Sequence, residues 1–331
     1  MSAALRLGTR RSALAMAQSQ MVADAVAAAS GRPVELVPIV SEGDVNRASL
    51  SELGGRGVFA NGLRESLAAG EVDLLVHSLK DLPTAQPDGL TIAATPTRED
   101  ARDVVITRDG TPLGALESGT VGTGSPRRIA QVRRHNPRVE VRDLRGNVDS
   151  RLARVRGGDL DAVVLAAAGL SRLGGDLGGL HAEAMGLAEW PTAPGQGSLA
   201  VETRTDAASD LLDALAALDD EQTRIEITAE RAVLSTLDAG CHAPVGTHAS
   251  VTAGDLRIRA VVYALDGAHR IGLDRTVRLP QGYARNSGSG DGADSADGAD
   301  PIARAARTGE DVAHRLLERG AADLVPREST P

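Results

Sequence analysis

The segment HSLKDLP at residues 77–83 holds the side chains of this chain that are best suited to acid–base chemistry. Lys80 is the only lysine among the 36 basic residues, and every other one is an arginine. A lysine ammonium is a compact charge whose pKa shifts on burial, whereas a guanidinium is a rigid fork that stays protonated. Asp81 is the best candidate for a general acid or base, because neighbouring cations can tune a carboxylate. A surface ion pair left in a loop is the alternative interpretation.

The position of this pair favours a functional role. The apolar run at residues 74–76 predicts a buried parallel strand, and Lys80 and Asp81 follow its C-terminal end. Open α/β sheets bind ligands at that end of their strands. We therefore expect a ligand site to begin at this turn.

An excess of arginine marks a second region. Residues 127–156 contain ten arginines and three acidic residues, a local charge of +7 in a chain whose net charge is −9. So strong a local excess predicts an anionic ligand, and guanidinium forks suit carboxylates as well as phosphates. A solvated, salt-bridged helix surface is the alternative, and we expect it for the members outside the junctions described next. These are Arg133, Arg134, Arg138, Arg154 and Arg156.

Three strand-to-helix junctions carry the more specific signals. The motif GTGSPRR at residues 122–128 predicts a cradle of backbone N–H groups for an anion, with Arg127 and Arg128 at its rim. Arg145 and Arg151 flank a second junction of this kind. The third, TRRS at residues 9–12, is equally consistent with a solvated helix cap beside two surface arginines.

Cys241 is the only cysteine, which excludes an internal disulfide framework and a cysteine-rich metal site. It lies in the segment AGCHAPVG between a predicted helix and a predicted sheet, outside any core pattern. An exposed loop thiol suits a nucleophile or a covalent anchor. A small buried hydrophobe is the alternative that position alone leaves open.

The bulk composition excludes several functional classes. Aromatic residues are 1% of the 331 residues and the net charge is −9, so general nucleic-acid binding or attraction to an anionic membrane is not expected. No apolar run is long enough to span a membrane and the N-terminus lacks a signal pattern, so we expect a cytoplasmic protein. P-loop, dinucleotide, zinc and nucleophile-elbow motifs are absent from the sequence, and we expect no metal.

The order of predicted elements indicates an α/β fold of about two to three domains. Strands and helices alternate from residue 5 to residue 166, which predicts mostly parallel sheets. Polar, turn-rich segments at 95–102 and 191–197 are candidate crossings between two such units. Strands joined by tight turns at 245–277 predict an antiparallel meander, and a final helix is expected from about residue 302 to 319. The glycine-rich segment 41–57 is read as a mobile loop and the acidic segment 284–300 as a flexible insertion.

Six motifs in register resemble the porphobilinogen deaminase family. They are HSLKDLP (77–83), GTGSPRR (122–128), LRGNVDSRL (144–152), LAAAGLSRLG (165–174), APGQG (193–197) and AGCHAPVG (239–246). The resemblance implies two domains similar to periplasmic binding proteins, at 1–98 with 198–218 and at 99–197. It also implies a smaller α/β domain with an antiparallel sheet at 219–331.

The resemblance implies an activity and a cofactor as well. Enzymes of this family join four porphobilinogen molecules head to tail, release ammonia at each addition, and hydrolyse off the linear tetrapyrrole hydroxymethylbilane. They use a covalently attached dipyrromethane as the primer. By motif, Cys241 matches the attachment point and Asp81 the catalytic carboxylate.

The same motifs imply which side chains hold carboxylates. Residues matched to cofactor binding are Lys80, Ser12, Ser125, Arg127 and Arg128, and those matched to substrate binding are Arg10, Arg145, Arg151 and Arg172. The resemblance also implies a monomer with no nucleic-acid or membrane partner. The loop at 54–65 reads GGRGVFANGLRE where the family usually carries lysines, which leaves its substrate contacts open. A non-enzymatic receptor for small anions and a nucleic-acid binder are the rival interpretations.

Overall fold

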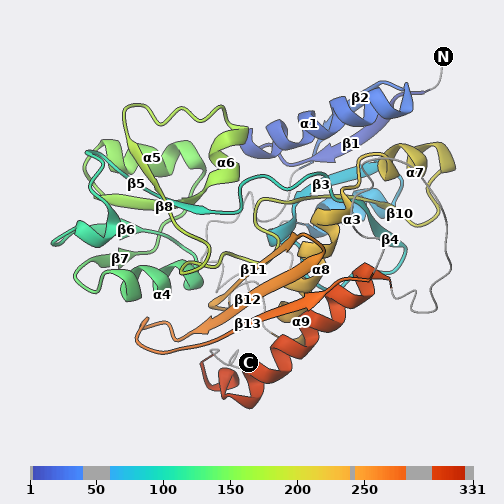
Figure 1. Ribbon diagram of the computed structural model, residues 1–331. Coiled ribbons are helices and arrows are strands. Elements are labelled where there is room, and N and C mark those ends of the chain that lie inside the picture. Colours follow the sequence, from blue (N-terminus) through green and yellow to red (C-terminus); the bar gives the residue numbers. More distant parts are fainter. Residues whose placement is uncertain (1–2, 40–59, 239–242, 281–299, 325–331) are drawn as a thin grey trace, which may run out of the picture.

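Three β-sheets organise the chain in the computed structural model, which describes residues 3–39, 60–238, 243–280 and 300–324 (Figure 1). Two five-stranded sheets are mostly parallel and the third, three-stranded sheet is antiparallel. The predicted α/β class, with two mostly parallel sheets and a smaller antiparallel one, is therefore confirmed.

The first sheet has the strand order β2-β1-β3-β10-β4. Its strands are β1 (Leu5–Thr9), β2 (Val34–Pro38), β3 (Leu74–Ser78), β4 (Leu90–Ala94) and β10 (Leu199–Arg204). Strand β1 runs parallel to β2 and β3, whereas β10 runs antiparallel to β3 and β4. Strand β3 is apolar and buried along most of its length because helices cover both faces of the sheet. These helices are α1 (Ala13–Ser30), α3 (Asn61–Ala68) and α7 (Ser209–Ala216).

The second sheet repeats this plan with the order β7-β6-β8-β5-β9. Its strands are β5 (Asp103–Thr107), β6 (Thr120–Gly122), β7 (Glu140–Arg142), β8 (Ala162–Ala166) and β9 (His181–Ala184). Its helices are α4 (Pro126–His135), α5 (Val148–Arg156) and α6 (Ala167–Arg172). In both sheets the fourth strand is the antiparallel one, and it is the first strand after a crossing from the other sheet. The two crossings therefore enter the sheets at equivalent places.

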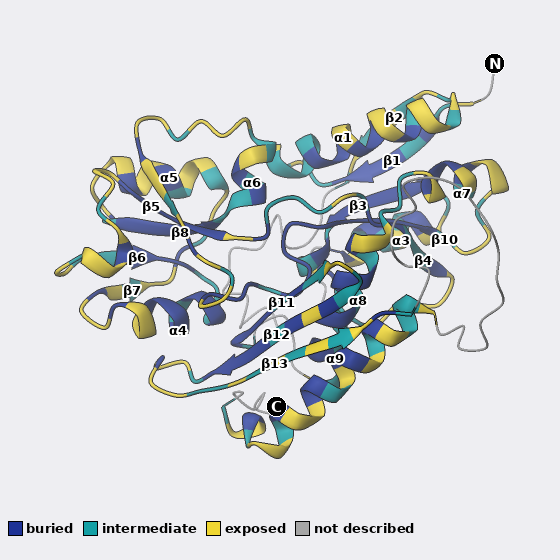
Figure 2. Ribbon diagram, viewed as in Figure 1, coloured by how far each residue is buried: buried dark blue, intermediate teal, exposed yellow. Residues whose placement is uncertain are grey.

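The third sheet is the predicted meander of β11 (Val245–Thr252), β12 (Asp255–Tyr263) and β13 (Arg270–Arg278). Helices α8 (Glu221–Thr236) and α9 (Pro301–Glu318) pack on it and on each other. Their approach requires Gly309, because a Cβ there would lie 2.3 Å from the carbonyl oxygen of Ala229. Figure 2 shows the resulting pattern on α9, buried toward the sheet and exposed outward.

The other helices of the described residues are single 3₁₀ turns: η1 (Leu79–Asp81), η2 (Leu113–Ala115) and η3 (Ala321–Asp323). Several predictions fall outside the described residues: Cys241, the loop at 41–57 and all of the acidic segment 284–300 except Asp300. Asp300 accepts a hydrogen bond from the backbone N–H of Ile302 and so caps α9. The domain boundaries at 98/99, 197/198 and 218/219 stay a prediction, which limited proteolysis would test.

Candidate active site

The turn that follows β3, residues 79–82, places two polar side chains between two buried leucines. Leu79 and Leu82 are 0% and 1% exposed, whereas Asp81 is exposed and Lys80 is partly buried. The backbone N–H of Leu82 donates to the Leu79 carbonyl oxygen at 3.1 Å, and that of Leu79 donates to the Ser198 carbonyl oxygen at 3.0 Å. The leucines thus anchor the 79–82 turn and leave Lys80 and Asp81 at its outer side.

Lys80 contacts the segment that returns from the second sheet to the first. Its Nζ donates to Oε1 of Gln196, at 3.4 Å. Burial and, less strongly, the neighbouring Arg128 lower the pKa of Lys80 to about 8, while Asp81 and Asp103 oppose the shift. The ammonium is therefore held among other cations in a partly desolvated position.

The structure corrects the expected position of Arg127 and Arg128. Both guanidiniums are buried, at 3% and 6% exposure, and not at the rim of an open cradle. The reason is Asp103, the fully buried first residue of β5. Arg127 Nη1 donates to Asp103 Oδ2 at 2.8 Å, and Arg128 Nη2 donates to Asp103 Oδ1 at 2.6 Å. Burial would raise the pKa of Asp103, but the two guanidiniums outweigh it and hold that pKa far below its usual range.

This cluster carries more positive than negative charge. Two buried guanidiniums and the Lys80 ammonium interact with Asp103 and with the exposed Asp81. Arg127 Nε is also buried with no hydrogen-bond partner among the described residues. Buried charge without a counterion is costly, so the cluster is suited to an anion.

The second arginine junction faces the same space. Arg151 donates from Nε to the Gly146 carbonyl oxygen at 2.8 Å, close to the start of α5. Burial lowers the pKa of Arg151, with Arg128 and Arg145 acting in the same direction and Asp81 among the groups that oppose it. Asp81 of the first unit thus interacts with the arginine cluster of the second unit through Arg151. Arg145 itself is partly buried and has partners of its own.

The other predicted residues also follow the carboxyl ends of parallel strands. Ser12 follows β1 and accepts a hydrogen bond from the backbone N–H of Ala15, so it caps α1. Arg10, just before it, is partly buried. Ser125 is the N-cap residue of α4, but its side chain makes no capping hydrogen bond. Arg172, at the end of α6, donates from Nη2 to the Gly197 carbonyl oxygen at 2.7 Å, and its Nε is buried without a hydrogen-bond partner in the described part of the chain.

The same-edge arrangement follows from the register of the strands. Strands β1 and β3 are parallel, so residues 10–12 and the 79–82 turn leave the first sheet at one edge. In the second sheet β6, β7 and β8 are parallel, so the GTGSPRR helix, the Arg145 junction and α6 also share one edge. Gln196 connects the two edges, because its side chain contacts Lys80, Arg128 and Asp103.

Two family models match the chain. One, described as "Porphobilinogen deaminase, dipyromethane cofactor binding domain", covers residues 5–211, and the other, "Porphobilinogen deaminase, C-terminal domain", covers residues 224–318. The chain belongs to the porphobilinogen deaminase family. It is 51% identical to a porphobilinogen deaminase of Leifsonia xyli over 330 residues, which cover 98% of this chain and 94% of the relative. It is 53% identical to porphobilinogen deaminase 1 of Streptomyces coelicolor over 291 residues, which cover 84% and 89%.

Among solved structures, two that the chain is similar to are a periplasmic binding protein and a solute binding protein. A Salmonella typhimurium periplasmic binding protein with high arginine specificity matches with a TM-score of 0.39 and 16% identity, covering 66% of this chain and 92% of that one. An ancestral cationic amino acid solute binding protein matches with a TM-score of 0.41 and 15% identity, covering 65% and 87%.

Two residues of this porphobilinogen deaminase site were missed by sequence reasoning. Asp103 lies in none of the motifs, although an acid at the start of a fully buried strand requires cationic partners. Gln196 lies within the APGQG motif, which was recognised without a role for its amide. The structure places both at the centre of the arginine cluster, where Gln196 Nε2 donates to Asp103 Oδ1 at 2.8 Å.

The described ranges lack the features of a metal site and of a membrane-spanning segment. They contain no cluster of three or more histidine, cysteine, aspartate or glutamate side chains arranged to hold a metal ion. None of their helices has the length and apolar character needed to cross a membrane.

Proposed function

We propose that Asp81 and the surrounding cations carry the hydroxymethylbilane synthase reaction of the porphobilinogen deaminase family. The family fixes the activity as a transferase of tetrapyrrole biosynthesis, which condenses four porphobilinogen molecules with release of ammonia and hydrolyses the product to hydroxymethylbilane. The matching family model also identifies a dipyrromethane cofactor binding domain within residues 5–211. The assignment of individual residues to steps is our proposal.

The observation that carries this proposal is the buried excess of positive charge between the two parallel-rich sheets. Each pyrrole of the substrate and of the cofactor carries two carboxylates, so a growing chain needs many cationic partners. The orphaned Nε atoms of Arg127 and Arg172 fit such a polycarboxylate. We assign Lys80, Ser12, Ser125, Arg127 and Arg128 to the cofactor. We assign Arg10, Arg145, Arg151 and Arg172 to the incoming substrate.

Asp81 is suited to the chemical step because its carboxylate is exposed toward this cationic region. It can accept a hydrogen bond from a pyrrole N–H and stabilise the positive charge that develops as ammonia leaves the substrate. Lys80 and the arginines orient the carboxylates of the reactants around it. The bound dipyrromethane supplies the primer to which the first substrate is joined, and we propose Cys241 as its thioether anchor.

Asp81→Asn tests the catalytic assignment. We expect the variant to retain the covalent mass of two pyrrole units, measured by intact-protein mass spectrometry, and to lose nearly all product formation. Asp88→Asn, which changes another exposed carboxylate nine residues after the turn begins, is the matched control and should keep wild-type turnover. Near-normal product formation by Asp81→Asn would contradict the assignment.

Cys241→Ser tests the anchor separately. The variant should lack the adduct of two pyrrole units after incubation with porphobilinogen. An adduct of unchanged mass would move the attachment point to another residue.

We further propose that the enzyme is a monomer. Met21 and Leu265 are the large hydrophobic side chains that are exposed among the described residues, and they belong to different units, so they form no common apolar patch. Light scattering should give the mass of one chain, and a dimer mass would contradict the proposal. The cytoplasmic location stays a prediction, which cell fractionation would test.

A further inference from the structure

Among the described residues, no hydrogen bond or ion pair holds the side chain of the proposed catalytic residue. Asp81 makes no hydrogen bond or ion pair with a described residue, although its neighbour Lys80 contacts Gln196. The direction of the Asp81 carboxylate therefore depends on the backbone of the 79–82 turn. What fixes that backbone is accordingly part of the catalytic arrangement.

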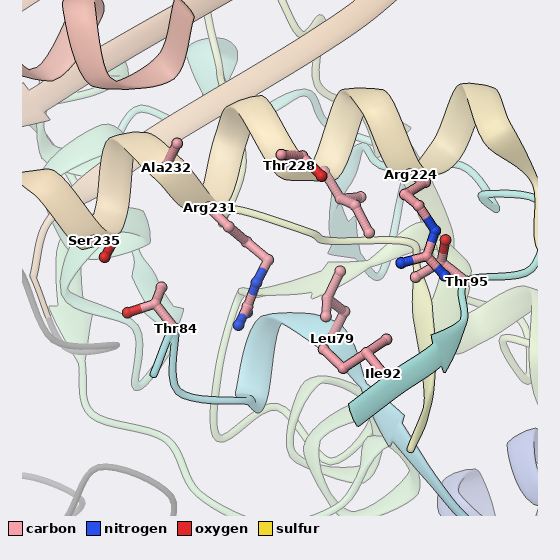
Figure 3. Close-up of a pocket in the computed structure, with 10 residues that line it drawn as sticks. Leu79, Thr84, Ile92, Thr95, Arg224, Thr228, Arg231, Ala232 and Ser235 are labelled. Carbon is pink, nitrogen blue, oxygen red and sulfur yellow. The ribbon is translucent and has the colours of Figure 1, made fainter. Parts of the chain in front are cut away.

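Helix α8 of the third unit lies against this turn. Ile227 is 4% exposed and belongs to the same buried apolar cluster as Leu79 and Leu82. One helical turn further along α8, Arg231 points toward the first unit, as Figure 3 shows. A cavity of about 260 Å³ lies between the helix and the turn, with Arg231 among its lining residues.

Arg231 binds the backbone directly after Asp81. Its Nη1 donates to the Leu82 carbonyl oxygen at 3.1 Å, and its Nη2 donates to the Pro83 carbonyl oxygen at 2.7 Å. A planar guanidinium holds two neighbouring acceptors in a fixed orientation, which a single donor does not. The turn is thus fixed on one side by the Ser198 carbonyl and on the other by Arg231.

We propose that Arg231 is a positioning residue that sets the orientation of Asp81 from the third unit. The proposal rests on the proposed catalytic role of Asp81. Helix α8 ends at Thr236, and Cys241 follows Arg231 by ten residues in the sequence.

Arg224 provides a matched control on the same helix. It lies two helical turns before Arg231, lines the same cavity, and also bonds to the first unit, donating from Nη2 to the Ala93 carbonyl oxygen at 3.1 Å. This contact is made at the end of β4, away from the 79–82 turn. Removing either guanidinium breaks a bond between the same two units, but only Arg231 holds the catalytic turn.

The test compares Arg231→Gln and Arg231→Lys with Arg224→Gln, all as cofactor-loaded enzymes verified by intact mass. We expect Arg231→Gln to lower kcat by about 10- to 100-fold with KM little changed, because a displaced acid affects the chemical step and not substrate binding. Arg231→Lys keeps the charge without the fork and should fall between Arg231→Gln and the wild type. Arg224→Gln should keep the wild-type kcat.

A double variant separates positioning from general damage. If Arg231 acts through Asp81, Arg231→Gln should cause no further loss of kcat in an Asp81→Asn background. Additive losses, or equal kcat values for Arg231→Gln and Arg224→Gln, would overturn the inference while Asp81→Asn alone still shows the loss that the proposed function requires. Retained turnover in Asp81→Asn would instead overturn the proposed function. Should Arg231→Gln fail to fold, Arg231→Lys supplies the same comparison.

Discussion

The compact charge of Lys80 fits the space between Gln196 and the Arg128 guanidinium. A second guanidinium at this position would have to share the Gln196 amide oxygen with Arg128, and it is wider than an ammonium. We therefore expect Lys80→Arg to load cofactor poorly and to turn over more slowly than the wild type. The fraction of loaded protein by intact mass and the kcat of that fraction measure the two effects. Wild-type values for both would make the lone lysine an accident of composition.

The pKa of Lys80 predicts how cofactor uptake depends on pH. In cofactor-free protein this pKa is about 8, so the ammonium loses its proton as the pH rises through that value. A neutral amine cannot pair with a carboxylate, and the rate of cofactor uptake should fall above pH ~8. In Lys80→Arg the rate, although lower, should stay flat over this range, because a guanidinium remains charged. A wild-type rate that is equally flat from pH 7 to pH 9 would contradict the prediction.

The lowered pKa of Lys80 also makes stability depend on pH, in the direction opposite to its effect on cofactor uptake. The folded-state pKa of Lys80 lies below the ordinary value of 10.5, so the folded protein binds this proton less tightly than the unfolded chain does. The buried charge therefore opposes folding below pH ~8, and this cost is relieved as the pH rises toward the unfolded value. Cofactor uptake and stability thus change in opposite directions above pH ~8.

Asp103 holds the arginine cluster together, and its removal should be strongly destabilising. Its carboxylate also accepts a hydrogen bond from Trp190 Nε1 at 2.9 Å. Asp103→Asn would leave Arg127 and Arg128 buried without their counter-charge, which typically costs about 3–5 kcal/mol. Urea unfolding of cofactor-free protein measures the loss, and Asp213→Asn, at an exposed position on α7, is the control. A loss no larger than that of the control would show that Arg127 and Arg128 do not need the Asp103 carboxylate as their counter-charge.

At the scale of elements, the two crossing segments bind each other where they enter the sheets. The Glu99 backbone N–H donates to the Gly197 carbonyl oxygen at 3.2 Å, and the Gln196 amide donates to the Ala101 carbonyl oxygen at 2.8 Å. Gly197 has a φ of +91°, and a Cβ there would lie 2.4 Å from the Glu99 carbonyl oxygen. The close approach of the crossings therefore depends on this glycine.

Gly197→Ala should lower the melting temperature much more than Gly174→Ala. Gly174 has almost the same φ, +90°, but a Cβ there would meet no atom within 4 Å. The Gly174 variant measures backbone strain alone, about 1–2 kcal/mol, whereas the Gly197 variant adds a clash between backbone segments. Calorimetry of both proteins compares the two, and equal melting temperatures would mean that the crossings separate easily.

Local sequence patterns predicted most of the elements but not the contacts between distant residues. Apolar periodicity located most strands and helices, because burial sets the same period that the sequence displays. Strand β9, HAEA, was missed because it is a mostly exposed edge strand without an apolar face, and α6 was missed because it is six residues long. The burial of Arg127 was not predictable locally, since its partner Asp103 lies 24 residues away in the sequence. The motifs located residues, but their partners required the fold.

At the scale of the whole molecule, Glu230 ties the three units together. It is fully buried on α8, and it accepts hydrogen bonds from Arg98 on the first crossing, from the Gly195 N–H on the second, and from the Ala249 N–H on β11. A single buried carboxylate thus joins the third unit to both crossings. This connection brings α8, with Arg231, against the 79–82 turn.

The charge distribution predicts that removing the cofactor weakens the whole fold. Lys80, Arg127, Arg128 and Arg151 interact across the space between the first two units, and without a polycarboxylate their mutual repulsion opposes closure. Cofactor-free protein, obtained as Cys241→Ser, should therefore unfold at a lower temperature than loaded wild-type enzyme. Citrate should recover part of the difference, whereas chloride at the same ionic strength should recover less, because one citrate ion can pair with several cations. Equal melting temperatures for the loaded and cofactor-free proteins would show that the arginine excess is balanced within the chain itself.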